Sequence, residues 1–156
     1  MKVDEREEEA VEMEGVSLDH DQGMVANIGA ITMRLIVSKA QTNGAFAVAE
    51  FRGPAGPWTV PHMHREMEES FYVLEGGCSF TIGERDVDAK QGAFVMVPRG
   101  TPHLVSGGSG GGTLLTIFAP GGLEEMFLEL GDLPAGSITD PQVRAEIAKR
   151  HDSVPV

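Results

Sequence analysis

The sequence predicts an all-β fold, a sandwich or barrel of short strands, followed by two short helices. Apolar or alternating segments recur at short, regular intervals between residues 31 and 119. Glycine and proline account for 20 and 9 of the 156 residues, which favours many short elements joined by turns. After residue 122 the apolar spacing changes from that of strands to that of helices.

The first two strands are expected at Ile31–Ala40 and Ala45–Arg52. They flank Gln41–Gly44, in which Asn-Gly is typical of a hairpin turn. Glycines at 76–77 and 107–112 are expected to form turns, the second a flexible loop. The remaining strands are expected at Thr59–His64, Ser70–Leu74, Cys78–Ile82, Ala93–Val97, Pro102–Ser106 and Thr113–Ala119.

Two helices are expected to close the chain, from about residue 122. The spacing of Leu123, Met126, Phe127 and Leu130 places these side chains on one helical face. A second helix is expected after Asp140-Pro141, because aspartate is a good N-cap and proline suits the first helical position.

One domain is expected over residues 22–156, preceded by an acidic segment over residues 1–21 that is expected to be flexible. That segment supplies −7 of the net charge of −12, because it contains nine acidic residues against Lys2 and Arg6. Its acidic residues are Asp4, Glu5, Glu7, Glu8, Glu9, Glu12, Glu14, Asp19 and Asp21.

Charge and hydropathy exclude several classes of protein. Nucleic-acid binding requires clustered Lys and Arg, so a net charge of −12 argues against a nucleic-acid partner. No apolar run approaches the roughly 18 residues of a membrane span, and the charged N-terminus lacks the apolar core of a signal peptide. A cytoplasmic protein is therefore expected. Cys78, the single cysteine, is expected to be a small buried apolar residue.

Three of the five histidines lie in one pattern with an acidic residue. Residues two apart in a strand point to the same face, so His62 and His64 present two imidazoles side by side. Glu69 follows after a polar break, and His103 opens a later apolar strand. A buried carboxylate among histidines needs compensation, which a divalent transition metal ion such as Fe, Mn, Co, Ni, Cu or Zn supplies.

These residues stand in two motifs that resemble those of the cupin superfamily. Residues 56–76 match G-x5-H-x-H-x4-E-x6-G, and residues 92–103 match G-x5-P-x-G-x2-H. The resemblance implies a cupin jelly-roll β-barrel with one metal ion inside. It also implies that the metal ligands are His62, His64, Glu69 and His103.

One position departs from the resemblance. The second motif usually continues with Asn four residues after its histidine, where this sequence has Gly107. The six-residue spacing to Gly76 selects Glu69 as the acidic ligand, with Glu68 as the alternative. Trp58 is expected either to line the pocket mouth or to have a packing or dimer-interface role. His20 and His151 are expected to be exposed.

Beyond the motifs, the sequence resembles small bacterial single-domain cupins described as quercetin-dioxygenase-like. This resemblance implies a metal-dependent oxidoreductase that acts on a small enol or aromatic hydroxyl substrate, with Glu69 ligating the metal or accepting the substrate proton. The alternatives are a metal-dependent isomerase, lyase or cyclase, and a non-catalytic cupin that binds a metal or small molecule.

The resemblance also implies a homodimer, with outward positions such as Leu74 or Leu114 covered by pairing. An apolar pocket for the substrate is expected inside the barrel. Its walls are expected to be Phe46, Phe71, Val73, Phe94, Met96 and Phe118.

Overall fold

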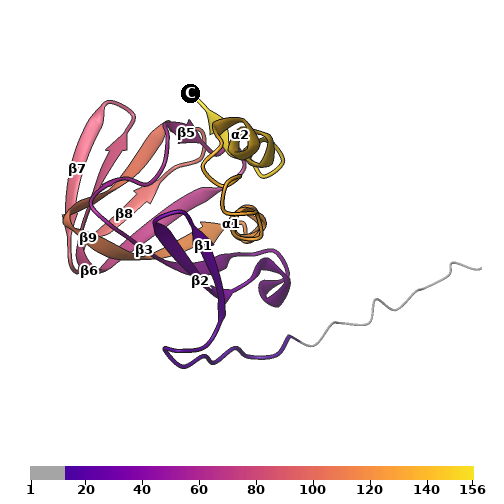
Figure 1. Cartoon of the computed structure of the whole chain (residues 1–156). Helices are drawn as coiled ribbons and strands as arrows, with labels where there is room; N and C mark the ends of the chain where they lie inside the picture. Colours follow the sequence, from indigo (N-terminus) through magenta and orange to yellow (C-terminus); the bar gives the residue numbers. More distant parts are fainter. Residues whose placement is uncertain (1–12) are drawn as a thin grey trace, which may run out of the picture.

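Two long antiparallel strands, β6 (Glu68–Ile82) and β9 (His103–Ala119), form the centre of the fold (Figure 1). Their pairing runs from Glu68 opposite Ala119 to Ile82 opposite His103. The computed structural model describes residues 13–156. The other strands are β1 (Met24–Ile28), β2 (Ile31–Val37), β3 (Ala47–Gly53), β4 (Gly56–Pro57), β5 (His62–Met63), β7 (Arg85–Lys90), β8 (Phe94–Val97) and β10 (Val154–Pro155).

Each long strand changes partners halfway along its length, which closes the sheet into a barrel. The first half of β6 lies between β8 and the second half of β9, which in turn pairs with β3. The second half of β6 lies between β7 and the first half of β9, which also pairs with β4 and β5. The all-β prediction is therefore confirmed.

The glycines expected to form turns lie inside these two strands, so that part of the prediction was wrong. Gly76 and Gly77 belong to β6, and residues 107–112 belong to β9, at the points where register shifts bend the pair. A Cβ on Gly112 would lie 2.5 Å from the carbonyl oxygen of Gly77. Glycine is therefore required by the close approach of two backbones.

The first hairpin is confirmed as an antiparallel pair of β2 and β3, but its connection is longer than a tight turn. A 3-10 helix, η1 (Lys39–Thr42), follows β2, and Asn43 adopts a left-handed conformation with φ 52°. Gln41 accepts a hydrogen bond from the Ser38 backbone N–H at 3.0 Å, which stabilises the start of this turn of helix.

Both expected helices are present, as α1 (Glu124–Gly131) and α2 (Pro141–Lys149), and they lie together at one side of the barrel (Figure 1). Asp140 caps α2 as expected, because its carboxylate accepts a hydrogen bond from the Gln142 N–H at 2.9 Å. Neither helix within residues 13–156 has the length and apolar character needed to cross a membrane.

Four strands were not expected from the sequence, two of them the two-residue strands β4 and β10. β1 precedes the expected start of the pattern, and β7 contains mainly polar residues, so neither shows a clear apolar alternation. Of the segment expected to be flexible, residues 1–12 lie outside the described residues, and residues 13–21 are exposed without helix or strand. Cys78 is buried as expected, and burial raises the pKa of its thiol to about 11.

Candidate metal centre

The structure brings together all four residues that the sequence singled out. His62, His64, Glu69 and His103 are buried, and one nitrogen or oxygen atom from each lies within 4.8 Å of those from the others. They come from β5, the residues just after it, the start of β6 and the start of β9. His62 and His103 are direct partners across the β5–β9 pair, which fixes two of the four side chains relative to each other.

Backbone carbonyl groups fix the protonation of all three imidazole rings. The Nδ1 atoms of His62, His64 and His103 lie 2.7, 2.7 and 2.9 Å from the carbonyl oxygens of Val60, Asp152 and Thr101. A carbonyl oxygen only accepts hydrogen bonds, so each Nδ1 carries the proton and donates it. Each Nε2 is thereby left with a free lone pair, the arrangement found in histidine ligands of metals.

Two of these Nε2 atoms face the Glu69 carboxylate. The Nε2 atoms of His64 and His103 each lie 3.1 Å from the same Glu69 oxygen, Oε2. With Nδ1 already protonated, either ring can donate to Glu69 only as an imidazolium cation. The buried cluster therefore requires added positive charge, from protons or from a metal ion.

The pKa values of the clustered side chains reflect this need for positive charge. Burial raises the pKa of the Glu69 carboxyl, but the hydrogen bonds from His103 and His64 outweigh burial and lower it to about 2. Burial lowers the pKa of His64, but the hydrogen bond and charge of Glu69, together with those of Asp152, outweigh burial and raise the net value. Burial, and next the nearby His103, lower the pKa of His62 to about 4. His62 therefore stays neutral down to about pH 4 and keeps the lone pair on its Nε2 atom.

The donor set fits a divalent transition metal ion. Nitrogen and carboxylate ligands lie about 2.0–2.2 Å from such an ion, so ligands on opposite sides of it are about 4.0–4.4 Å apart. The widest separation here, 4.8 Å, requires only a small inward movement of the side chains. Three neutral imidazoles and one carboxylate suit Fe, Mn, Co, Ni, Cu or Zn, and the ligand types do not select among them.

A residue far along the chain supports the cluster. The Asp152 carbonyl accepts the His64 hydrogen bond, and its carboxylate accepts bonds from the backbone N–H groups of Arg65 and Glu66 at 2.8 and 2.9 Å. The next residues form β10, which pairs with β5 beside His62. The sequence offered no signal for this role, because Asp152 lies in a polar stretch 88 residues from His64.

The alternative acidic ligand, Glu68, lies outside the cluster. Its carboxylate accepts two hydrogen bonds from Arg99, at 2.9 and 2.6 Å. His20 is exposed as expected. The expectation for His151 was wrong, since its side chain is only 16% exposed and hydrogen-bonds to Glu129 at 2.7 Å.

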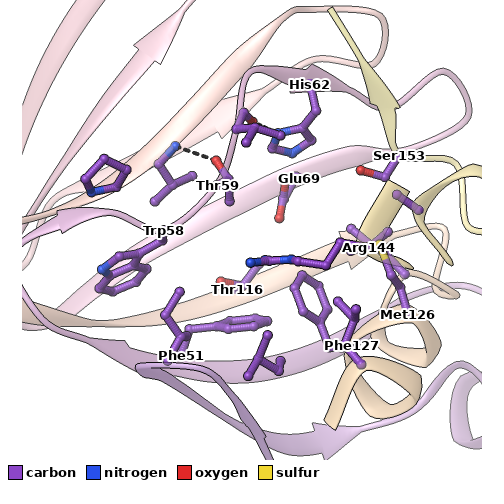
Figure 2. A pocket seen from close by; sticks show the side chains of 18 of the residues that line it. Phe51, Trp58, Thr59, His62, Glu69, Thr116, Met126, Phe127, Arg144 and Ser153 are labelled. Atoms are coloured by element: carbon purple, nitrogen blue, oxygen red, sulfur yellow. Dashed lines mark hydrogen bonds between the residues drawn. The ribbon is translucent and has the colours of Figure 1, made fainter. Parts of the chain in front are cut away.

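A cavity of about 480 Å³ opens beside the cluster, and Figure 2 shows Glu69 and His62 at its wall. Most of its lining is apolar, contributed by the barrel interior, α1 and α2. Phe51 and Phe127 form an edge-to-face pair with ring centroids 4.8 Å apart. The principal apolar lining residues are Ile28, Ile31, Phe51, Trp58, Phe71, Val105, Leu114, Leu123, Met126, Phe127 and Leu130.

Three of the six predicted pocket walls were wrong, and two others, Val73 and Phe118, are buried in the barrel but do not line the cavity. Phe71 lines the cavity, whereas Phe46, Phe94 and Met96 are exposed by 41%, 63% and 47%. Leu114, expected to point outward, is 1% exposed and lines the cavity. In β8 the buried positions are Val95 and Val97, and a strand of four apolar residues carries no alternation from which to predict its inner face.

Trp58 lines the cavity and explains the glycine at position 107. Its indole N–H donates to the Pro54 carbonyl at 2.8 Å. A Cβ on Gly107 would clash with Pro54 and lie 2.9 Å from the Trp58 indole nitrogen. The side chain usual at this position would therefore clash with the Pro54 carbonyl and crowd the Trp58 indole.

Comparison with known proteins agrees with this geometry. Residues 50–118 match the Cupin domain family. The chain is 31% identical over 105 residues to quercetin 2,3-dioxygenase from Bacillus subtilis, an alignment that covers 67% of this chain and 31% of that enzyme. The chain thus spans less than a third of the length of this curated relative.

Solved structures show the same fold. An RmlC-like cupin from Shewanella frigidimarina superposes with a TM-score of 0.57 at 18% identity, covering 69% of this chain and 91% of that one. Oxalate decarboxylase from Bacillus subtilis superposes with a TM-score of 0.60 at 18% identity, covering 69% of this chain and 29% of that one. With the jelly-roll barrel, the matched domain and the buried cluster of three histidines and one glutamate, this chain belongs to the cupin superfamily and carries a site for a divalent metal.

Proposed function

We propose that this chain is a metal-dependent oxidoreductase of the quercetin-dioxygenase type, which acts on a small enol or aromatic hydroxyl substrate. The observation that carries the proposal is the convergence of four electron-pair donors, three of them from residues that line an apolar cavity. The 31% identity to quercetin 2,3-dioxygenase supports the reaction class.

In this proposal His62, His64, Glu69 and His103 hold one divalent transition metal ion. When bound, the ion would act as a Lewis acid toward a substrate hydroxyl and would provide redox chemistry with dioxygen. The three backbone carbonyls that hold the Nδ1 protons keep the rings oriented and their lone pairs directed inward.

The cavity walls would bind the rest of the substrate. Phe51, Phe71 and Phe127 offer aromatic faces and edges to a planar ring. A volume of about 480 Å³ lies within the usual range for small-molecule sites. The apolar walls would also exclude water from the reacting end of the substrate, which strengthens electrostatic interactions there.

Glu69 is the proposed proton acceptor as well as a ligand. Its carboxylate lies at the cavity wall, where it can reach the hydroxyl of a substrate bound at the cluster (Figure 2). The Glu69 Oε2 atom faces His64 and His103, so Oε1 is the proposed proton acceptor. Loss of the hydroxyl proton to Glu69 would leave the substrate as an enolate or phenolate.

Metal analysis followed by oxygen uptake tests this function. Protein purified without a histidine tag should contain about one divalent transition metal ion per chain, and His62→Ala protein should contain much less. Metal-loaded protein should consume oxygen with at least one flavonol, 1,3-diketone or catechol. Substrate conversion without oxygen uptake would instead indicate an isomerase, lyase or cyclase. Absence of conversion across these compounds would indicate a non-catalytic binding protein.

A further inference from the structure

Thr116 is a polar exception on the inner face of the barrel. It lies in β9 between the inward-facing residues Leu114 and Phe118, and it is fully buried. Its hydroxyl has no hydrogen-bond partner among residues 13–156, although it lines the cavity beside the candidate metal centre. Buried hydroxyl groups in proteins are almost always paired, so the missing partner is expected to enter through the cavity.

Arg144 brings a positive charge into the same cavity. It projects from α2, and Figure 2 shows its side chain extended into the cavity between Glu69 and Thr116 in this view. No ion pair joins Arg144 to a carboxylate within the described part of the chain. Arg144 is exposed to solvent and also lines the cavity, so its guanidinium is available to an anionic group that binds there.

We propose that Arg144 and Thr116 form a subsite for a carboxylate group of the substrate. A guanidinium presents two parallel N–H donors that match the two oxygens of a carboxylate. The Thr116 hydroxyl would donate a further hydrogen bond from the barrel wall. Arg144 is the only Lys or Arg that lines the cavity within residues 13–156, so a singly charged carboxylate fits better than a phosphate.

This subsite deepens the proposed function, on which it rests for the identity of the other end of the substrate. The substrate would carry an enol or aromatic hydroxyl at the metal centre and a carboxylate at Arg144, joined by an apolar part that contacts Phe51 and Phe127. The four-ligand cluster alone does not distinguish such a compound from a neutral flavonol, whereas Arg144 selects the acid.

Paired acid and amide probes test the subsite by binding, without turnover. The first pair, 3-phenylpropanoate and 3-phenylpropanamide, lacks any hydroxyl. The second pair, 3-(3,4-dihydroxyphenyl)propanoate and its amide, adds a catechol for the metal. Affinities are measured by calorimetry on the full chain at matched metal content, with wild type, Arg144→Gln, Thr116→Val, Thr116→Ser and Arg85→Gln proteins.

Wild type should bind each acid about tenfold or more tightly than its amide, the usual effect of a charge-assisted hydrogen bond. Arg144→Gln should abolish this preference, Thr116→Val should reduce it about threefold, and Thr116→Ser should retain it. Arg85→Gln is the control for charge, because exposed Arg85 lies on β7 and is not among the cavity residues. An acid preference that Arg144→Gln leaves unchanged, or equal affinities for acid and amide in wild type, would overturn the subsite.

The two probe pairs separate this inference from the proposed function. A preference for phenylpropanoate that depends on Arg144, together with no added affinity from the catechol, would support the subsite and contradict substrate binding at the metal. Catechol binding with oxygen uptake, but without an Arg144-dependent acid preference, would support the function and contradict the subsite.

Discussion

The carbonyl oxygen of Asp152 accepts a hydrogen bond from His64 Nδ1 at 2.7 Å, across 88 residues of sequence. The same residue holds the two residues after His64 through its carboxylate. Asp152 has a positive φ of 53°, a conformation that Asp and Asn tolerate better than most residues. One residue near the C-terminal end of the chain therefore orients a metal-site histidine and the backbone beside it.

Replacing Asp152 by Ala should weaken metal binding without removing a ligand. Loss of the two carboxylate bonds frees the backbone at Arg65 and Glu66, so His64 is held less firmly. Loss of outer support of this kind lowers metal affinity by about tenfold to a hundredfold. Competition with a chelator measures the affinity. Asp88→Ala, at an exposed position on β7, should leave the metal affinity unchanged. Asp152→Asn should give an affinity between those of wild type and Asp152→Ala.

Replacing Glu69 by Gln tests catalysis at the proposed base. The amide keeps an oxygen donor but loses the negative charge and the ability to take a proton. Metal affinity should fall moderately, and turnover at matched metal occupancy should fall by about a hundredfold or more. His62→Ala should act by losing metal instead, so occupancy must be measured in each protein. Full metal with unchanged turnover in Glu69→Gln would end the proton-transfer role.

Replacing Thr116 by Val should stabilise the protein by about 1 kcal/mol, because the change removes a buried hydroxyl without a partner. Thermal or urea unfolding measures the difference. Thr59→Val is the matched control, since the Thr59 hydroxyl accepts a hydrogen bond from the Val105 N–H at 3.0 Å, and its loss should destabilise by about 1 kcal/mol. Equal destabilisation by both changes would show that the Thr116 hydroxyl is satisfied in solution.

The exposed apolar residues of β6 and β8 predict a homodimer. Tyr72 lies opposite Phe94 in the strand pair, Met96 lies on the same outer face, and all three are at least 44% exposed. Light scattering should give about twice the chain mass of 16.7 kDa. Phe94→Asp should shift it to the monomer mass, whereas Phe46→Asp, at an exposed position outside this face, should not. A monomer at all concentrations in wild type would contradict the prediction.

The contacts of Glu129 predict a loss of stability in acid. Hydrogen bonding from His151 outweighs the effect of burial and, with the charge of Arg150, lowers the pKa of the Glu129 carboxyl below its ordinary value. A lowered carboxyl pKa stabilises the fold above the pKa of the unfolded chain, and this contribution is lost as pH falls through the folded value. Glu129→Gln should therefore unfold more easily at neutral pH, with the difference from wild type shrinking as the pH is lowered. A difference that is independent of pH would contradict this assignment.

The sequence predicts the four clustered residues because strand alternation pairs His62 with His64 and the resemblance to the cupin motifs supplies Glu69 and His103. Strand alternation places His62 and His64 on one face, and motif spacing selects Glu69 over Glu68. The residues it missed, Asp152, Arg144 and Thr116, depend on where α2 and β10 close against the barrel, which no local pattern records. Glycine runs are equally ambiguous in sequence, because glycine serves both a flexible turn and a close crossing of strands, as at Gly77 and Gly112.

The pairing of β10 with β5 sets an order of assembly during synthesis. A ribosome adds about 5–20 residues per second, so Asp152, 49 residues after His103 (152 − 103), is made roughly 2–10 s later. His62, His64, Glu69 and His103 are therefore all translated before the segment that covers them. Until β10 pairs with β5, Asp152 cannot accept the His64 hydrogen bond, so ion binding at the cluster and docking of the C-terminal segment are expected to favour each other.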